Sequence, residues 1–404
     1  MSQNTRSILV ESLNLPRFNT MDELSQIIGL SSRLLYCLSM KTSNYYKNKE
    51  IPKRNGNFRE ISIPSYTLHI VQHWILINIL NKLLPSNRAM AFRRGELFGH
   101  KQNAFYHLHT LYGLSIDLKD FFPSITANKV YNVFSNIGYN HFAATILTNL
   151  CTLHGKLPQG SACSPALSNI VCITLDRRLI GLCEKRGIRF TRYADDMYFS
   201  CDDKALLLKN YPIIIKIIND EDFIINTQKT HFHTPSNQKR ITGVTVSPTN
   251  KEGIIELKAP KILKKKVRAE IFKSILSGKY ENKEHILGEI SYIDFIEKEN
   301  DTPYLPLIKK YIQSTATKIQ YFPELVEAYN NNHFYSGLKK LESKEITIDE
   351  DEYEYFEFLF KVRKKYLLKN NLDDICTYST WPQIMEESEV ILDSFDNIDN
   401  APWL

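Results

Sequence analysis

The chain has 404 residues, of which 43% are hydrophobic and 24% charged, a usage that excludes a fibrous or wholly disordered protein and allows two or three domains. Its net charge of +6 is unevenly spread: residues 342–404 carry 16 acidic and 6 basic side chains, which leaves 45 basic and 29 acidic ones in residues 1–341. A body this basic suggests a polyanionic partner such as nucleic acid, and the alternative is an ordinary soluble surface.

The seven cysteines are odd in number and include no C-x-x-C pair, which argues against a disulfide framework and against a zinc knuckle. The sequence has no apolar run that approaches a membrane span, and its start lacks a basic-then-apolar signal segment. We therefore expect a cytoplasmic protein with reduced thiols and no membrane span.

The first part of the chain predicts helices and a short strand. Thr20 and Glu23 have the Thr-x-x-Glu form of a capping box, so we expect a helix to begin there. Residues 57–64 alternate polar and apolar side chains, which indicates a strand after a basic turn at 53–57. Residues 66–84 are apolar nearly all round and predict a buried helix.

Strands and helices alternate in the middle of the chain. A strand is expected at 114–120, and Thr126 can cap the helix that follows. One long helix, opened by a Ser-Pro pair, is predicted over 164–183. Two short strands, 188–193 and 197–200, flank a tight turn.

After these strands the pattern predicts one more helix, then strands, then a basic helical region. Residues 205–218 have helical spacing although they include Pro212. The last expected strands are 222–226, 240–246 and 253–257. From about 261 to 319 the pattern is helical and basic, and an acidic tail follows.

Three aspartates are the strongest candidates for chemistry. Asp117 ends a strand that looks buried, and Asp195 and Asp196 lie in the turn between two apolar strands. Desolvating a carboxylate costs several kcal/mol, so an aspartate pair buried here needs compensation. Mg²⁺ can supply it, because this ion favours one or two carboxylates together with substrate phosphates. The alternative is an exposed hairpin tip, where two aspartates need no partner.

The residues around these aspartates resemble the catalytic motifs of reverse transcriptases. Residues 193–196 (YADD) match the Y-x-D-D box, 115–125 (SIDLKDFFPSI) resemble the first catalytic motif, and 157–169 (LPQGSACSPALSN) resemble the motif that positions template and nucleotide. The motifs occur in the order of the family, and the resemblance covers roughly 50–320. It implies an α+β right-hand polymerase with fingers, a palm of antiparallel strands and helices, and a helical thumb.

Two further motifs resemble those of bacterial retron reverse transcriptases. Residues 103–107 (NAFYH) fit the N-A-x-x-H box, and 241–243 (ITG) resemble the V-T-G triplet, with isoleucine in place of valine. A capped helix and a strand turn are the alternative for these motifs. The organisation that the resemblance implies is an N-terminal helical segment, fingers, palm, thumb and an acidic C-terminal helical extension, over 1–50, 51–113, 114–250, 251–320 and 321–404.

The resemblance assigns roles to the aspartates and to one aromatic side chain. Asp117 and Asp195 are implied to coordinate two Mg²⁺ ions, and Asp196 to complete the acidic cluster while binding metal less directly. Phe122, which follows the first aspartate by five residues, resembles the bulky residue that excludes a 2′-hydroxyl and so favours dNTPs. The alternative for this phenylalanine is a core aromatic.

Five more residues are implied to bind the incoming dNTP. Gln159 and Gly160 would lie against the nascent base pair, where glycine allows a close backbone approach. Lys229 would neutralise or protonate the leaving pyrophosphate. Lys53 and Arg59 would clamp the triphosphate. Ordinary exposed side chains are the alternative for these three basic residues.

The segment 258–273 contains seven basic side chains, which on a polymerase thumb are expected to contact phosphates rather than to form only a solvated face. The residues expected to contact RNA are Lys264, Lys265, Lys266, Arg268, Asn103, His107 and Thr242. For the histidines of the chain, a structural role is the alternative to RNA contact.

The resemblance also implies a biological role. A retron reverse transcriptase copies part of its cognate noncoding RNA, primed by the 2′-hydroxyl of an internal guanosine, and the branched RNA–DNA product (msDNA) serves in defence against phage. The acidic extension would be a structural cap or a docking surface for a separate effector or toxin protein.

Two other classes of protein remain as alternatives. One is a non-retron bacterial reverse transcriptase, of the abortive-infection or the group II intron type. The other is a non-enzymatic RNA-binding scaffold that sequesters a toxin. The sequence has no Cys/His pairs of the kind an intron endonuclease carries, and its three aspartates are intact, which argues against the scaffold.

Overall fold

The computed structural model describes residues 10–52, 56, 58–236, 239–247, 256–277 and 282–297. It divides the chain into two compact units, Met1–Ile255 and Glu256–Leu404. Lys53 and the whole acidic extension lie outside the described residues, and the five expected domain boundaries stay predictions. None of the helices in the described ranges is both long enough and apolar enough to cross a bilayer. The six cysteines within these ranges are free thiols.

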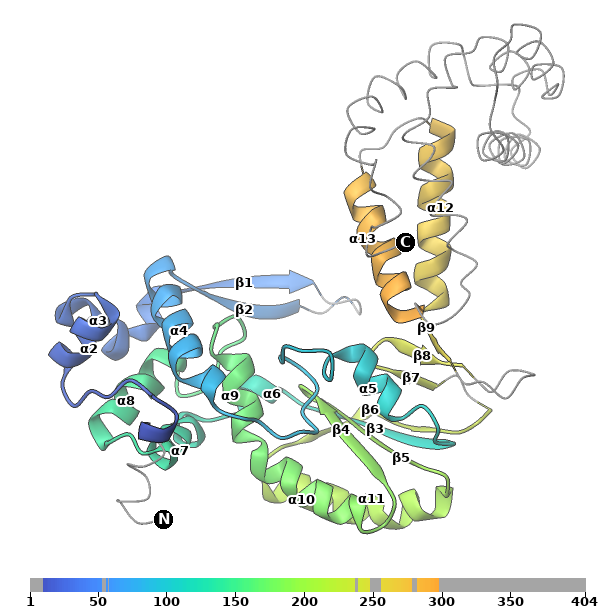
Figure 1. The fold of residues 1–404 in the computed structure, drawn as a ribbon, viewed down its shortest axis with the longest axis horizontal. Helices are drawn as coiled ribbons and strands as arrows, with labels where there is room; N and C mark the ends of the chain where they lie inside the picture. The colour runs from blue at the N-terminus through green and yellow to red at the C-terminus, as the bar shows by residue number, and fades with distance from the viewer. Residues whose placement is uncertain are drawn as a thin grey trace, which may run out of the picture. The chain divides into compact units, whose positions relative to one another are not determined.

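The first unit begins with short helices around a two-stranded hairpin (Figure 1). Its elements are α2 (Met21–Ile28), α3 (Ser32–Met40), η1 (Thr42–Tyr45), the antiparallel strands β1 (Tyr46–Pro52) and β2 (Phe58–Pro64), α4 (Tyr66–Asn78), η2 (Leu80–Lys82) and α5 (His100–Tyr106). The predicted helix start is confirmed: Thr20 Oγ1 accepts from the Glu23 amide at 3.2 Å, while the Glu23 carboxylate accepts at 2.7 Å from the amide of Asn19, the residue before the cap. The helix predicted over 66–84 ends earlier, at Asn78.

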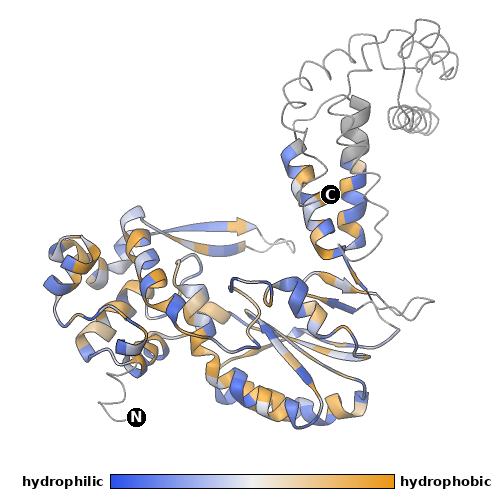
Figure 2. Ribbon diagram, viewed as in Figure 1, coloured by the Kyte–Doolittle hydropathy of each residue, from blue (hydrophilic) through white to orange (hydrophobic). Residues whose placement is uncertain are grey.

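A four-stranded antiparallel sheet in the order β4-β5-β3-β6 forms the centre of this unit. Its strands are β3 (Tyr112–Leu118), β4 (Arg189–Tyr193), β5 (Asp196–Cys201) and β6 (Ile225–His233). Two helices, α10 (Ile173–Glu184) and α11 (Lys204–Asp220), pack along one side of it (Figure 1). Both carry hydrophobic and hydrophilic residues (Figure 2), as expected of helices that bury one face against a sheet. The central strands therefore have a covered face.

The other helices described in the first unit pack mainly against one another and against α3, α4 and α10. They are α6 (Phe121–Ser124), α7 (Ala127–Ile137), α8 (His141–Cys151) and α9 (Ser164–Val171). Thr126 caps α7 as predicted, since its hydroxyl accepts from the Lys129 amide at 3.4 Å. Pro212 does lie inside α11. Because proline has no backbone N–H, the carbonyl of Leu208 has no helical donor. Leu208 is half-exposed, so water can supply the missing hydrogen bond.

Three predicted elements differ from the structure. The single helix expected over 164–183 is two helices, because the backbone leaves the helical region at Cys172, where ψ is 1°. The strand expected at 222–226 begins only at Ile225. The strand expected at 240–246 is a hairpin of β7 (Lys239–Ile241) and β8 (Val244–Val246), because Thr242 and Gly243 have φ values of 44° and 87° and form a two-residue turn.

The second unit contains β9 (Leu257–Lys258) and two helices, α12 (Lys261–Ser277) and α13 (Lys283–Glu297), which contact each other. Buried apolar side chains come from both helices: Val267, Ile286, Ile290, Ile293 and Ile296. The helical character predicted from residue 261 onward is thus confirmed over 261–277 and 283–297, and 278–281 and 298–319 fall outside the described residues.

Two glycines offer a test of how the sheet and its helices pack. A Cβ on Gly113 of β3 would lie 2.1 Å from the hydroxyl oxygen of Tyr198, whereas a Cβ on Gly181 of α10 meets nothing within 4 Å. We predict that Gly113→Ala lowers the free energy of unfolding by about 1–3 kcal/mol through overpacking. Gly181→Ala should raise it by about 0.5–1 kcal/mol through helix propensity. Urea unfolding followed by circular dichroism measures both, and equal effects would contradict the strand pairing.

Candidate active site

Three aspartates meet where β3 and β5 run side by side. Asp117 of β3 is directly opposite Asp196 of β5 in the strand register. Asp195 lies in the turn that joins β4 to β5, and its carbonyl accepts a hydrogen bond from the Leu118 amide at 3.0 Å. The turn is tight because Ala194 adopts a left-handed conformation, with φ at 58°. The strand pairing therefore places side by side two parts of the chain, about 80 residues apart in the sequence, that carry these three aspartates.

Asp117 is held by two side chains of β6. Its Oδ1 accepts from Asn226 Nδ2 at 2.9 Å, and its Oδ2 accepts from Lys229 Nζ at 3.0 Å. The register of β6 shifts between Asn226 and His231, so that Lys229 lies in a bulge, a feature that often redirects side chains beside active sites. The Asp117 side chain is 8% exposed and that of Lys229 63% exposed, so the lysine reaches into the site from solvent.

Burial and like charge shape the electrostatics of the site. Burial raises the pKa of Asp195, and the charge of Asp117 adds to this, while Lys229 and Arg59 oppose it. Burial and the two neighbouring aspartates raise the pKa of Asp196 to about 6. The hydrogen bond to Asp117 raises the pKa of Lys229, which keeps this side chain protonated at neutral pH. The site therefore holds more negative charge than the surroundings readily stabilise.

A divalent cation that prefers oxygen ligands would balance the excess negative charge of the three aspartates. Carboxylate oxygens are hard ligands, and Mg²⁺ commonly binds through one or two of them together with substrate phosphates. Asp117, Asp195 and Asp196 are the residues that would hold it. Lys229 bonds to Asp117 Oδ2, so a cation that binds this oxygen competes with the ammonium group. Because the lysine side chain is largely exposed, it can swing aside.

Gln159 and Gly160 brace the hairpin strand β2. The Gln159 carbonyl accepts from the Ser62 amide at 2.8 Å, and a Cβ on Gly160 would lie 2.3 Å from the Ser62 carbonyl oxygen. Gly160 also has φ at 129°, which side chains disfavour. A close backbone approach at this glycine was expected. In the structure the approaching group is the protein backbone of β2, and contact with a nascent base pair stays a prediction.

Phe122 and Arg59 lie on elements that flank the aspartates. Phe122, in α6, is half-buried, and its ring centroid lies 5.5 Å from that of Phe121 and 6.2 Å from that of Phe92. Arg59 is an exposed residue of β2 whose charge acts on Asp195. Their expected contacts with nucleotide stay predictions, as does that of Lys53.

The expected RNA contacts of Asn103 and His107 are wrong for this structure, because both side chains are buried and bonded within the protein. His107 Nε2 lies 2.8 Å from Thr191 Oγ1, and its Nδ1 lies 2.6 Å from Ser200 Oγ. The Thr191 hydroxyl donates its only proton to Asn103 Oδ1, so its oxygen must accept a hydrogen bond from His107 Nε2. The proton of the neutral imidazole is therefore on Nε2, and Nδ1 accepts from the Ser200 hydroxyl. Burial holds the pKa of His107 well below its usual value, which keeps the ring neutral.

The same network ties the N-A-x-x-H box to the I-T-G triplet. Asn103 Nδ2 donates to Thr242 Oγ1 at 3.4 Å, and the Thr242 hydroxyl donates to the His100 carbonyl at 3.2 Å. Lys239 of β7 donates to the carbonyls of His107 and Thr110 at 2.5 and 2.9 Å. The two motifs therefore fasten the β7–β8 hairpin to the sheet. Contact between the hairpin tip at Thr242 and RNA stays a prediction.

In the second unit, two of the basic residues expected to contact RNA are engaged by carboxylates of α13. Lys264, whose side chain is 15% exposed, forms an ion pair with the buried Glu297. Its ammonium group is engaged by a carboxylate of the protein, and its expected RNA contact stays a prediction. Lys266 Nζ lies 2.6 Å from Glu289 and 3.6 Å from Glu270. Lys265 and Arg268 are exposed, so phosphate contact by these two stays a prediction.

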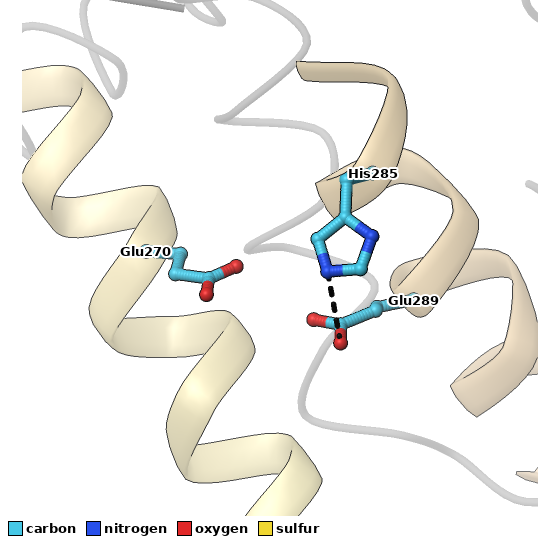
Figure 3. Close-up of side chains that lie close together, drawn as sticks. All are labelled: Glu270, His285 and Glu289. Carbon is cyan, nitrogen blue, oxygen red and sulfur yellow. Dashed lines mark ion pairs between the residues drawn. The ribbon is translucent and has the colours of Figure 1, made fainter. Parts of the chain in front are cut away.

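The second unit also contains a cluster of three side chains that could each offer a metal ligand: Glu270, His285 and Glu289. Their ligand atoms all lie within 4.8 Å of one another, and within the described ranges this is the one such group of histidine, cysteine or carboxylate side chains. Figure 3 shows Glu270 reaching from one helix toward the other two residues on the facing helix. The ammonium group of Lys266 lies among them, 3.2 Å from His285 Nε2. A protein cation therefore already balances this cluster, which joins α12 to α13.

The sequence arguments missed Asn226, which fixes one carboxylate oxygen of Asp117. A signal was present, because Asn226 precedes Lys229 by three residues in the INTQKT segment. Its contribution depends on pairing between β3 and β6 across more than 100 residues, which the local pattern does not reveal.

Sequence comparison relates the chain to one family of known proteins. The family model described as reverse transcriptase (RNA-dependent DNA polymerase) matches residues 51–246. The chain is 34% identical over 305 residues to the retron Ec86 reverse transcriptase of Escherichia coli, covering 74% of this chain and 92% of that protein. It is 29% identical over 326 residues to the retron Mx65 reverse transcriptase of Myxococcus xanthus, covering 74% of each. A solved telomerase from Candida albicans with a fragment of telomeric RNA superposes with a TM-score of 0.42 at 12% identity, over 81% of this chain and 68% of that one.

The raised pKa of Asp196 predicts how metal affinity depends on pH. Below about pH 6 this carboxylate is protonated in the free enzyme, so a cation must displace the proton before it binds. We predict that Mg²⁺ affinity is nearly constant above pH 7 and falls roughly tenfold per pH unit below 6. Calorimetric titration between pH 5 and 8 measures this, with Asp196→Asn as the control that should bind more weakly and depend less on pH. An affinity that does not change over this range would contradict the assignment.

Proposed function

The chain belongs to the retron reverse transcriptases, and we propose that it copies part of a cognate noncoding RNA into DNA that stays joined to that RNA. As a member of this family it is an RNA-directed DNA polymerase that depends on a divalent metal and binds an RNA template. The observation that carries the proposal is the cluster of Asp117, Asp195 and Asp196 at the junction of β3 and β5.

The aspartates are proposed to bind two Mg²⁺ ions, Asp117 and Asp195 directly and Asp196 less so. When bound, such ions lower the pKa of the attacking hydroxyl and stabilise the charge on the triphosphate and the leaving group. The chain itself supplies the orientation: Asn226 fixes one oxygen of Asp117, and the Leu118 amide fixes the backbone of Asp195. This rigidity matters because a preorganised site stabilises charge without reorganising during the reaction.

Lys229 is proposed to act at the leaving pyrophosphate. Its ammonium lies 3.0 Å from Asp117 Oδ2 on an exposed side chain, and its raised pKa keeps it protonated at neutral pH. With a cation held at Asp117, the Lys229 ammonium would turn from that carboxylate toward the phosphates. There Lys229 would neutralise the developing charge or donate a proton to the leaving group.

The incoming dNTP is proposed to lie between the aspartates and the β1–β2 hairpin. Arg59 would bind the triphosphate from β2, together with Lys53. Gln159 and Gly160, which hold β2 at Ser62, would keep this strand in place and line the nascent pair. Phe122 would lie beneath the sugar, supported by the rings of Phe121 and Phe92, and exclude a 2′-hydroxyl.

RNA recognition is proposed to use phosphate contacts from the second unit and the tip of the β7–β8 hairpin. Lys265 and Arg268 are exposed on α12, and Thr242 lies in the hairpin turn. Lys266 can contribute only by exchanging its bonds to Glu289 and Glu270. Priming from the 2′-hydroxyl of an internal guanosine would leave the product branched.

The biological role that we propose is defence against phage in the bacterial cytoplasm. In this role the RNA–DNA product would act with a separate effector or toxin protein. Residues 342–404, with 16 acidic and 6 basic side chains, are unsuited to holding RNA and would suit a basic protein partner. A structured RNA with inverted repeats encoded next to the gene would support the retron assignment of substrate.

The metal-binding carboxylates should be essential for synthesis and dispensable for RNA binding. We predict that Asp117→Asn and Asp195→Asn each lower the rate of DNA synthesis on an RNA template on the order of 10³-fold or more, because each variant loses a metal ligand. A matched control is Asp222→Asn, which removes an exposed carboxylate at a position with φ of 60° that asparagine tolerates. Primer extension and an RNA gel shift measure the two activities, and normal extension by either active-site variant would overturn the assignment.

Phe122 should control the choice of sugar. Phe122→Val opens space beneath the nucleotide, so the ratio of rNTP to dNTP incorporation should rise on the order of tenfold or more, as expected when a steric filter is removed. Phe105→Val, at a half-exposed phenylalanine of α5, is the control. Single-nucleotide incorporation on a fixed template measures the ratio. If the ratio stays at the wild-type value in Phe122→Val, the side chain serves only in packing.

A further inference from the structure

A fully buried ion pair lies directly behind the catalytic turn. The side chains of Arg192, on β4, and Asp176, on α10, are both 0% exposed. Their contact is bidentate, with Arg192 Nε and Nη2 donating to the two carboxylate oxygens of Asp176 at 2.8 Å each. This is the geometry in which arginine binds carboxylates most strongly. Along the chain, Arg192 comes shortly before the turn aspartate Asp195, separated from it only by Tyr193 and Ala194.

The third nitrogen of the guanidinium group reaches the turn itself. Arg192 Nη1 donates to the Ala194 carbonyl at 3.2 Å and to Asn169 Oδ1 at 3.1 Å. Ala194 is the residue in the left-handed conformation. The carbonyl of the next residue, Asp195, accepts from the Leu118 amide at 3.0 Å. The carbonyls of Ala194 and Asp195 are therefore each held by a specific donor.

The guanidinium group is itself anchored from several directions. Asn169, on α9, donates through Nδ2 to the Ala91 carbonyl at 2.8 Å. The backbone of Arg192 pairs with the preceding segment, since its amide donates to the Arg88 carbonyl and its carbonyl accepts from the Met90 amide, both at 2.8 Å. Helices α9 and α10 and the segment 88–91 therefore all form hydrogen bonds with Arg192.

Stability alone does not account for this pair. Replacing a buried ion pair with apolar residues of similar volume is often neutral or stabilising, because desolvation of both charges offsets their attraction. Lysine would satisfy the charge of Asp176, but its single ammonium lacks the planar fork that bonds the carboxylate, Asn169 and Ala194 together. What arginine supplies here, and lysine does not, is a fixed donor aimed at the Ala194 carbonyl.

We propose that Arg192, clamped by Asp176 and Asn169, is a positioning residue that fixes the turn conformation from which Asp195 presents its carboxylate to metal. This inference rests on the proposed metal-binding role of Asp195. Because its side chain is fully buried, Arg192 acts through the peptide that precedes Asp195 and not through contact with substrate.

The test removes the clamp without leaving a buried charge. The double variant Arg192→Met with Asp176→Val keeps an apolar pair of similar volume, and Arg192→Lys keeps the charge while losing the fork. The control is Arg178→Met, at a more exposed arginine that pairs with Asp220 and Glu221. Each variant is measured for melting temperature, for kcat and KM with dNTP, and for calorimetric Mg²⁺ affinity in the absence of substrate.

The proposal predicts that the double variant stays folded, with kcat at least tenfold lower, Mg²⁺ affinity weakened, and the KM for dNTP within about twofold of wild type. Arg192→Lys should fall between, and Arg178→Met should match wild type in kcat and Mg²⁺ affinity. The proposal is overturned if the folded double variant keeps wild-type kcat and Mg²⁺ affinity, or if unfolding at the assay temperature accounts for all loss of activity in both Arg192 variants. Asp195→Asn, assayed in parallel, tests the proposed function separately: its inactivity upholds that function whatever the Arg192 variants do.

Discussion

Three carboxylates that repel one another are held near each other by strand pairing, and the chemistry proposed for the site depends on this arrangement. The register of β3 and β5 places Asp117 opposite Asp196, and the turn before β5 adds Asp195. Burial and mutual repulsion raise the pKa of Asp195 and of Asp196. The aspartates stay ionised only if cations or hydrogen-bond donors stabilise their negative charge. This arrangement therefore suits the binding of divalent metal ions together with substrate phosphates.

The surrounding structure acts to keep this arrangement rigid. Asn226 and Lys229 hold Asp117, while Leu118 holds the backbone of Asp195. The loop containing Gly160 approaches β2 so closely that a side chain would not fit, which couples the hairpin to the segment proposed to line the nascent base pair. Each of these contacts joins segments distant in sequence, so the precision of the site comes from tertiary packing.

Local sequence patterns were sufficient to single out the aspartates that the structure places at the junction of β3 and β5. The aspartates lie at strand ends and in a tight turn, features that short motifs define, and the helix caps at Thr20 and Thr126 are equally local. Asn103 and His107 show where such reasoning fails. Their motif was identified, but its role depends on hydrogen bonds to Thr191 and Ser200, more than 80 residues away, which turn polar side chains into buried structural ones.

The basic run on α12 shows the same limit for charge. Counting lysines predicted a phosphate-binding face, but Lys264 and Lys266 form ion pairs with glutamates of α13 once the two helices pack. Charge patterns along one segment therefore overestimate the positive surface that is available to RNA.

The most direct measurement of the central claim is the number of metal ions that the aspartates hold. Electron paramagnetic resonance can count Mn²⁺ bound to the enzyme with an RNA template, a dideoxy-terminated DNA primer and the matching dNTP. The account predicts two tightly bound ions in the wild-type complex, consistent with two-metal phosphoryl transfer, and the loss of tight binding in Asp195→Asn. Equal Mn²⁺ binding by the wild-type enzyme and this variant would contradict it.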